Sequence, residues 1–330
     1  MKRERVILNP LLNTMVRLNE YRDAEMGKKR WIFVGIILII IGVSLRFFVK
    51  ESSTDGASQR VKPIVAVSTF TLYEVSSVIA GETLEIFPIV PLGSDAHMFS
   101  PAPAQVAKIS NAAFFIYNGA GFETWAESLK HTLPKAVNVI DMSTHVALLK
   151  EKDNGAYDPH YWLDIDNMIN MTQTLENEFA QLFPVNAPLY HSNAMEYIAK
   201  LQKLKSEYVH GLRECKNRTL ISNHDAFGYL AHANDLQNVS IIGLSSDEQP
   251  SAKTISEVIA RIKEHGIKTI FFEEMINDNV AQTIARETGA KAQPLQPLEN
   301  ISEDELKSHQ TYESIMHANL AKLTQAMECR

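Results

Sequence analysis

Three histidines and one late glutamate are the side chains of this chain with the clearest capacity for chemistry. His97 lies in a loop bounded by glycine and proline, and His160 lies in a turn that precedes a helical segment. His224 follows an apolar strand-like run, and Glu299 follows the last such run of the chain. Imidazole nitrogens and carboxylate oxygens are donors that transition metals such as Zn²⁺ take in proteins. Two donors from each half of the chain would suffice to hold one ion.

Spacing alone does not establish a metal site. The four residues are 63, 64 and 75 positions apart, and a chain with 11 histidines offers many such combinations. Ordinary surface or helix-capping histidines fit the same spacing. The choice between these interpretations depends on the elements that position the side chains.

Apolar strands and amphipathic helices alternate from Pro63 onward. The pattern predicts strands over 64–70, 85–90, 113–117, 137–141, 218–222, 239–244, 268–272 and 291–295. It predicts helices over 72–80, 105–111, 164–183, 187–213, 227–233, 252–265, 277–288 and 312–328. Strands separated by helices pair in parallel, and ligands bind where such strands end. We therefore expect an α/β fold of two lobes with short parallel sheets flanked by helices.

The helix over 187–213 is long enough to join two lobes. At about 1.5 Å per residue it would measure ~40 Å, which exceeds the width of one small domain. We expect an N-terminal lobe over 63–185, a connecting helix over 186–214 and a C-terminal lobe over 215–330. A cleft between the lobes would then receive the candidate ligands.

Charge and cysteine content limit the classes of partner and site. The net charge is −7, with 10 Lys+Arg against 4 Asp+Glu in residues 1–50 and 22 against 35 in the remainder. An acidic body repels nucleic-acid phosphates, so we expect no nucleic-acid partner. Two cysteines are too few for a Cys-rich zinc module. Any metal must therefore be bound by histidines and carboxylates.

The N-terminal part of the sequence predicts a membrane anchor. Residues 31–45 are uninterruptedly apolar, and the run extends to 49 past Arg46. Lys28, Lys29 and Arg30 precede it, which places residues 1–30 in the cytoplasm and the body outside. We expect an uncleaved transmembrane signal anchor over 31–49 and a polar linker over 50–62, with cleavage near Ala57 as the alternative. No cysteine lies near this segment, which excludes a lipid-modified N-terminal cysteine.

Four local sequence frames resemble one family of transport proteins. In order, these are Gly-x-Asp-x-His-x-Phe-x-Pro around His97, Asp-Pro-His-x-Trp-x-Asp around His160, Asn-His-Asp-Ala-Phe-Gly-Tyr around His224, and Phe-Phe-Glu ending at Glu273. Together they resemble the metal-binding receptors of ABC importers for zinc and manganese, a group that includes zinc-uptake receptors and laminin-binding lipoproteins. The resemblance covers about residues 62–330.

This resemblance implies one transition-metal site in the cleft. Carried over by position, His97 and His160 are ligands from the first lobe and His224 is a ligand from the second. Gln296 stands where manganese receptors and some zinc receptors have an Asp, so that ligand does not carry over. The Pro-Leu-Glu frame assigns Glu299 as the fourth ligand instead. Glu273 is expected to be a buried supporting carboxylate.

Ligand chemistry favours zinc over manganese. Three imidazoles and one carboxylate suit tetrahedral Zn²⁺, whereas Mn²⁺ prefers more oxygen donors. Four protein ligands leave no open position for an activated water, so we expect carriage and no enzymatic activity. We therefore expect a monomeric solute-binding protein that captures Zn²⁺ on the extracytoplasmic (periplasmic) side of the bacterial cytoplasmic membrane and delivers it to an ABC permease. The alternatives are a manganese receptor of the same architecture and a metal-stabilised surface adhesin.

Several supporting residues remain open from sequence alone. We expect Asp164 to cap a helix, whereas Asp158 and Asp225 fit capping and the orientation of an imidazole equally well. Cys215 and Cys329 both lie in the predicted second lobe, where they would either form a disulfide or remain apart.

Overall fold

The structure is a computed structural model, and it describes residues 62–91, 93–150, 155–244, 250–273 and 279–330. Residues 62–330 form one compact unit. The predicted cytoplasmic segment, the predicted anchor over 31–49 and almost all of the predicted linker lie outside the described residues. Among the residues that are described, no helix has the length and apolar content needed to cross a membrane.

The first lobe is a parallel four-stranded sheet with helices on its two faces. Its elements in order are β1 (Ile64–Val67), α2 (Phe70–Ala80), β2 (Glu85–Pro88), α3 (Pro103–Ile109), β3 (Phe114–Tyr117), α4 (Thr124–Lys130) and β4 (Asn138–Asp141). The strands lie in the order β2-β1-β3-β4, and each neighbouring pair is parallel. The two central strands are the most apolar because both of their faces are covered.

The second lobe repeats this arrangement. It contains β5 (Thr219–Ser222), α7 (Gly228–Ala233), β6 (Gln237–Ser240), α8 (Ala252–His265), β7 (Thr269–Phe272), α9 (Asn279–Thr288), β8 (Lys291–Pro294), α10 (Glu303–Lys307) and α11 (Tyr312–Ala326). The strand order β6-β5-β7-β8 is that of the first sheet. Each sheet therefore changes winding direction beside its first strand, which is where ligands bind in open α/β sheets.

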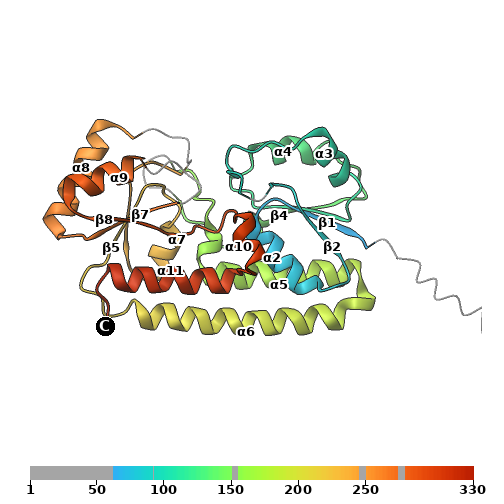
Figure 1. The fold of residues 1–330 in the computed structure, drawn as a ribbon. Coiled ribbons are helices and arrows are strands. Elements are labelled where there is room, and N and C mark those ends of the chain that lie inside the picture. Colours follow the sequence, from blue (N-terminus) through green and yellow to red (C-terminus); the bar gives the residue numbers. More distant parts are fainter. Residues whose placement is uncertain (1–61, 92, 151–154, 245–249, 274–278) are drawn as a thin grey trace, which may run out of the picture. The chain divides into compact units, whose positions relative to one another are not determined.

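Long helices carry the two lobes. Between the sheets the chain forms the 3₁₀ turns η1 (Met142–His145) and η2 (Tyr161–Leu163), α5 (Ile165–Leu182), the turn η3 (Pro184–Asn186) and α6 (Ala187–Gly211). The 25 residues of α6 measure ~38 Å. The helix runs beneath both lobes, and α11 and α5 lie between it and the sheets, α11 under the second lobe and α5 toward the first (Figure 1). The Tyr208 hydroxyl on α6 donates to the Met316 carbonyl of α11 at 2.7 Å. The predicted two-lobe fold with a long linking helix is confirmed.

One hydrophobic core continues through both lobes. It includes Val65 from β1, Leu175 from α5, Leu201 from α6 and Leu323 from α11, all fully or almost fully buried. Two smaller clusters fill the outer faces of the sheets, under α3 and α4 in the first lobe and under α8 and α9 in the second. The shared core anchors both lobes to the same helices, so the cleft between them has a fixed floor.

Some sequence-based boundaries are corrected by the structure. The predicted strand over 239–244 begins earlier, at Gln237, because β6 pairs with β5 through Thr219↔Gln237 and Ser222↔Ser240. Phe70, expected at the end of a strand, starts α2. The short helices α4 and α10 were not predicted.

Cys215 and Cys329 form a disulfide that closes a loop with a sequence separation of 114. The two residues are also backbone neighbours in an isolated antiparallel bridge. The Arg330 N–H donates to the Glu214 carbonyl at 3.0 Å. Of the two possibilities left open by the sequence, a disulfide or two separate thiols, the structure has the disulfide. It joins the segment after α6 covalently to the end of the chain.

Candidate metal site

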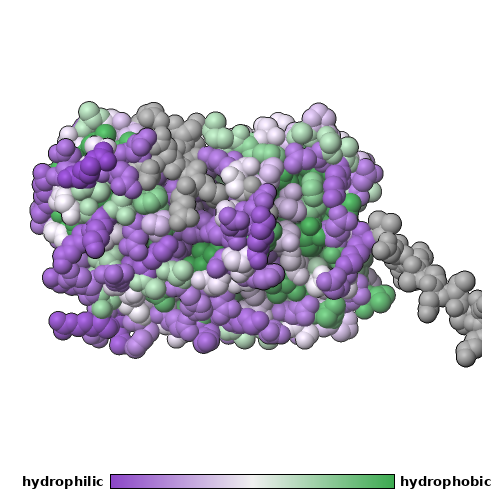
Figure 2. All heavy atoms as spheres, viewed as in Figure 1, coloured by the Kyte–Doolittle hydropathy of each residue, from purple (hydrophilic) through white to green (hydrophobic). Residues whose placement is uncertain are grey.

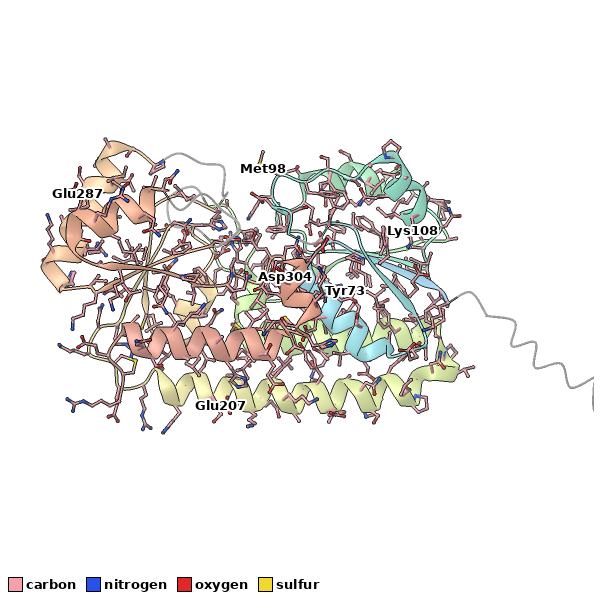
Figure 3. The ribbon with its side chains drawn as sticks, viewed as in Figure 1. Tyr73, Met98, Lys108, Glu207, Glu287 and Asp304 are labelled. Carbon is pink, nitrogen blue, oxygen red and sulfur yellow. A yellow bond between two sulfur atoms is a disulfide. The ribbon has the colours of Figure 1, made fainter. Side chains whose placement is uncertain are left out.

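Three of the four candidate ligands follow strands of the two sheets, and the fourth precedes a 3₁₀ turn. His97 lies in the loop after β2, and His160 lies immediately before η2. His224 comes just after β5, and Glu299 lies in the segment between β8 and α10. Parallel strands end at a common edge, so donors that follow them converge. Met98, next to His97, is 63% exposed and projects from the first lobe on the side of the second lobe (Figure 3).

The structure brings the four side chains into one cluster. His97, His160, His224 and Glu299 each offer one donor atom, and these atoms all lie within 4.8 Å of one another. His97 Nε2 is 3.4 Å from Glu299 Oε2, His160 Nε2 is 3.1 Å from Glu299 Oε1, and His224 Nδ1 is 3.8 Å from Glu299 Oε1. The glutamate is therefore the centre around which the three imidazoles gather.

The donor atoms are buried, and several lack a hydrogen-bond partner. The side chains of His160, His224 and Glu299 are at most 3% exposed, and that of His97 is 7% exposed. His97 Nε2, His160 Nε2 and Glu299 Oε1 are buried atoms with no hydrogen bond. A buried polar atom without a partner costs free energy unless something else satisfies it. Three such atoms that face one another are the arrangement that a bound cation would satisfy.

Asp158 orients the His160 ring. His160 Nδ1 lies 2.8 Å from Asp158 Oδ1, which also accepts from the His160 backbone N–H at 2.9 Å. The other ring nitrogen, Nε2, is thereby directed at Glu299. The backbone of Gly228 approaches from the second lobe so closely that a Cβ there would lie 2.6 Å from Asp158 Oδ2. Asp158 is thus an imidazole-orienting residue, one of the two roles that sequence left open.

His224 is held by a backbone carbonyl and a buried carboxylate. Its Nε2 lies 2.9 Å from the Leu244 carbonyl oxygen, and its Nδ1 lies 3.2 Å from Glu273 Oε2. Only Nε2–H can donate to the carbonyl, which leaves the Nδ1 side of the ring facing the two carboxylates. Glu273 is almost fully buried and lies outside the four-donor cluster, as expected of a supporting group.

His97 is positioned by its own loop and by an aromatic ring. Its backbone N–H donates to Asp95 Oδ1 at 2.9 Å, which tightens the turn. Phe122 packs against the imidazole with ring centroids 4.4 Å apart, and also contacts Trp162 at 5.4 Å. Phe122 belongs to a loop after β3 that approaches Asp141 closely, since a Cβ on Gly119 would lie 1.9 Å from Asp141 Oδ1.

The segment that carries Glu299 follows β8 of the second lobe and is hydrogen-bonded to the first lobe. The Asn300 side chain donates to the carbonyls of Pro91 and Ser94, at 2.7 and 2.9 Å, in the loop that carries His97. The Phe70 N–H at the start of α2 donates to the Glu299 carbonyl at 3.2 Å. Leu298 has a φ of +64°, a left-handed conformation that is uncommon for a non-glycine residue and clusters at functional sites. Glu299 is therefore placed between the lobes by a constrained backbone.

The charges of the cluster balance one another. Burial by itself lowers the pKa of His160, but the hydrogen bond to Asp158 and the carboxylate of Glu299 outweigh it and raise this pKa to about 10. Burial would raise the pKa of Glu299, but the charge of His97 and contacts with His160 hold it well below its usual range. Burial and the neighbouring Glu299 charge raise the pKa of Glu273 to about 7. Without metal, a protonated His160 imidazole thus lies against the Glu299 carboxylate.

The remaining predicted supporting residues take structural roles. Asp164 caps α5 by accepting from the Asp166 N–H at 2.9 Å, as predicted. Asp225, just after β5, accepts a hydrogen bond from the Asn238 side chain of β6. The Gln296 side chain lies 3.3 Å from Glu305 and accepts from the Leu298 N–H, so it stabilises the turn before Glu299.

Two supporting groups were missed by sequence reasoning. The Leu244 carbonyl has no sequence signal, because every residue carries one. Phe122 had a usable signal, because it follows Gly119-Ala-Gly121 in the loop after the predicted strand over 113–117. Loops that follow predicted strands also contain other candidate ligands.

The donor spacing fits a small tetrahedral ion. Ligands ~2.0–2.1 Å from a tetrahedral Zn²⁺ lie about 3.3 Å from one another, because the edge of a tetrahedron is about 1.6 times its radius. His160 Nε2 and His224 Nδ1 lie 3.1 and 3.8 Å from Glu299 Oε1, on either side of this value, and the four donor atoms all lie within 4.8 Å of one another. Three nitrogens and one carboxylate are also the donor types of tetrahedral zinc sites.

The fold and the cluster define a two-lobe α/β binding protein with a candidate transition-metal site between its lobes. Residues 65–326 match the family model described as zinc-uptake complex component A, periplasmic. The chain belongs to this family of ABC-importer receptors, which confirms the resemblance seen in the sequence frames.

Individual relatives agree with this assignment. The zinc-binding protein AdcA of Streptococcus pyogenes serotype M1 is 30% identical over 311 residues, which cover 87% of this chain and 60% of AdcA. The high-affinity zinc uptake system protein ZnuA of Bacillus subtilis is 31% identical over 315 residues, covering 91% of this chain and 98% of that protein. The crystal structure of the Zn(II)-bound ZnuA-like domain of Streptococcus pneumoniae AdcA superposes with a TM-score of 0.72 at 33% identity, covering 81% of this chain and 99% of that domain. This chain spans about 60% of the length of the AdcA relatives.

Proposed function

We propose that this protein captures Zn²⁺ between its two lobes and delivers it to an ABC permease for uptake. The observation that supports this most directly is the buried cluster of three imidazoles and one carboxylate, with unpartnered donor atoms that face one another. His97, His160, His224 and Glu299 are the proposed ligands. Zinc is the transported cargo in this account, and no chemical reaction follows its capture.

Selectivity for zinc follows from the donor set. Mn²⁺ prefers additional oxygen ligands. The position at which manganese relatives carry an aspartate holds Gln296, whose side chain contacts Glu305 and the backbone of Leu298. Glu273, the further carboxylate that approaches His224, lies outside the cluster of four donors. A manganese receptor is therefore the less well supported alternative.

Release requires that at least one ligand bond weakens when the receptor docks on the permease. Glu299 is the ligand best placed for this role, because its segment follows β8 of the second lobe and is hydrogen-bonded to the first lobe. Any change in the separation of the lobes would act on Asn300, which is bonded to the first-lobe loop that carries His97.

The proposed cellular arrangement follows from the sequence. Residues 31–49 would span the cytoplasmic membrane, residues 1–30 would lie inside, and residues 50–62 would link the span to the lobes at 63–185 and 215–330. The binding unit would then work as a tethered monomer on the extracytoplasmic side, next to its permease.

Competition between metals tests this function. The full chain, stripped of metal by a chelator, is titrated with Zn²⁺ in the presence and absence of a hundredfold excess of Mn²⁺. We expect the zinc titration to be unchanged by manganese. Displacement of zinc by manganese would favour the manganese alternative, and retention of neither metal would refute both.

A further inference from the structure

The segment that joins α5 to α6 exposes apolar side chains and contains no charged residue. Residues 182–189 read Leu-Phe-Pro-Val-Asn-Ala-Pro-Leu. Val185, within η3, is 91% exposed, and Leu182 and Leu189 on either side are 40% and 42% exposed. We call Leu182, Val185 and Leu189 the corner patch. Figure 2 shows hydrophobic residues at this end of the molecule, below the first lobe. Exposed apolar groups gathered at one tip are characteristic of an interaction site.

The corner patch stands on a rigid base. Phe183 packs against Phe114 of β3 with ring centroids 6.3 Å apart. Pro184 starts η3 and Pro188 lies in the first turn of α6, where each fixes its own φ. Because the backbone is already fixed, the patch would lose little conformational entropy on contact with a partner.

The chain enters the lobes beside the corner patch. Tyr190, one residue after Leu189, has its hydroxyl 2.9 Å from Thr83 Oγ1. Thr83 lies just before β2, whose first residue, Glu85, donates its N–H to the Pro63 carbonyl at 2.9 Å. Lys62, the first described residue, pairs with Glu82 at 2.6 Å. The corner patch and the entry point of the chain therefore share one end of the molecule.

The sequence before Lys62 places a membrane within reach of this end. The apolar run over 31–49 is the expected membrane span, and residues 50–61 extend over at most ~40 Å. A linker of this length keeps Lys62 within about 40 Å of the expected span.

The charge around the entry point is compatible with lipid headgroups, although the body of the protein is acidic. Glu82 pairs with Lys62, and Glu85 pairs with Lys108 at 2.8 Å. Lys108 lies on α3, at the end of the first lobe away from the cleft (Figure 3). Pairing of these acids with lysines lowers the repulsion that they would otherwise exert on anionic headgroups.

We propose that the corner patch inserts into the interfacial region of the phospholipid bilayer to which the chain is tethered. Three side chains give a weak contact on their own, but the tether raises their effective concentration at the membrane. The contact would fix a second point of the receptor on the bilayer and so set the direction in which the cleft opens. This inference depends on the proposed tether and is independent of the metal that the cleft binds.

Probes at the two ends of α6 test this proposal. Val185→Cys and, as the matched control, Val209→Cys are labelled with a nitrobenzoxadiazole fluorophore in the full chain, with Cys215 and Cys329 held in their disulfide. Val209 is also exposed, at 53%, but lies near the other end of α6. On phosphatidylcholine–phosphatidylglycerol vesicles we expect the probe at 185 to shift to shorter emission wavelength and to be quenched by spin-labelled lipid. The probe at 209 should show neither change, and Leu182→Glu with Leu189→Glu should abolish the response at 185.

Each contrary outcome has a defined meaning. A chain that floats with vesicles while both probes stay in water refutes the patch contact and leaves the tether standing. A chain that does not float refutes both. Equal responses at 185 and 209 indicate non-specific adsorption and overturn the proposal. A response at 185 that depends on protein concentration in the absence of lipid indicates that a second copy of the chain is the partner. A response that requires the permease indicates docking on the permease. Either result overturns the proposed contact with the bilayer.

Discussion

Asp158 Oδ1 lies 2.8 Å from His160 Nδ1 and thereby directs His160 Nε2 at Glu299, 3.1 Å away. The carboxylate fixes both the ring orientation and the nitrogen that remains for a metal. Residues that orient a ligand imidazole in this way commonly change metal affinity by about 10- to 100-fold when they are replaced.

The first prediction is that Asp158→Asn weakens zinc binding by about 10- to 100-fold without unfolding the protein. Asparagine retains an oxygen that can accept a hydrogen bond but lacks the negative charge that favours and orients the His160 ring. Competition with a fluorescent zinc chelator measures the affinity, and circular dichroism monitors the fold.

Gly228→Ala tests the same relationship without altering Asp158. Its Cβ would lie 2.6 Å from Asp158 Oδ2, so the carboxylate must move. We expect weaker zinc binding for this variant, whereas Gly211→Ala, in α6 and far from the cluster, should bind as the native chain does. Native affinity in both Asp158→Asn and Gly228→Ala would show that the ring needs no support.

The second prediction concerns pH. Zinc binds the unprotonated imidazole, so it must expel the proton from His160, whose pKa is raised to about 10. As pH falls from 9 to 6, protonation competes increasingly with zinc, and the apparent affinity should fall about tenfold per pH unit for each proton released. With ordinary histidines, which titrate near 6.5, the loss would begin only as pH drops through that value. A constant affinity between pH 7 and 9 would contradict the prediction.

The third prediction concerns Glu74, a buried carboxyl on α2 that accepts from the Tyr312 N–H at 2.8 Å. Burial raises its pKa to about 7 from a usual value of 4.5. A raised pKa in the folded state means that this group's stabilising contribution is complete below pH 4.5 and is lost as pH rises through 7. The loss is about 3 kcal/mol, at about 1.4 kcal/mol per pH unit.

Glu74→Gln should remove this loss. Urea unfolding at pH 4.5 and pH 8 measures the free energy of unfolding of both proteins. We expect the variant to gain about 3 kcal/mol relative to the native chain between the two pH values. The exposed Glu257→Gln on α8 serves as a matched control. An equal pH dependence in the native chain and Glu74→Gln would rule out this role for Glu74.

Much of the fold could be predicted because its signals are local. The strand β3 is a run of four buried, largely apolar residues, which is visible in the sequence. The helix α8 has a helical spacing of apolar residues, and its observed ends are the predicted ones. The boundaries of β6 could not be found in this way, because pairing with β5 decides which residues enter the sheet. The apolar Ile241 and Ile242 lie beyond it. The helices α4 and α10 are short, and their periodicity is too brief to detect.

The site shows the same division. His97, His160, His224 and Glu299 were found because each stands in a recognisable local frame, and the structure brings them together; their role as ligands stays a prediction. Other contacts of the site join residues far apart in the chain. These are the hydrogen bond between His224 and the Leu244 carbonyl, and those from the Asn300 side chain to the carbonyls of Pro91 and Ser94. Such contacts depend on tertiary packing, and the local sequence carries no sign of them.

The fourth prediction is that the double variant Cys215→Ser, Cys329→Ser loses stability but keeps its zinc affinity. The disulfide closes a loop with a sequence separation of 114, for which the chain-entropy model gives about 5 kcal/mol. It joins the end of α6 to the chain terminus, and neither cysteine belongs to the donor cluster. Urea unfolding should show the loss, and chelator competition should give an unchanged affinity. Unaltered stability would mean that the packing of α11 on α6 suffices without the covalent bond.

The fifth prediction is the most direct test of the central claim, that His97, His160, His224 and Glu299 bind one Zn²⁺. Elemental analysis after dialysis against zinc measures the stoichiometry, with isothermal titration calorimetry for the affinity. We expect one tightly bound zinc in the native chain and in His191→Ala, whose side chain is 66% exposed and pairs with Glu176. His97→Ala and His224→Ala should lose this zinc while they retain the native circular dichroism spectrum. A native chain that stays metal-free in excess zinc, or alanine variants that keep a full equivalent, would contradict the account.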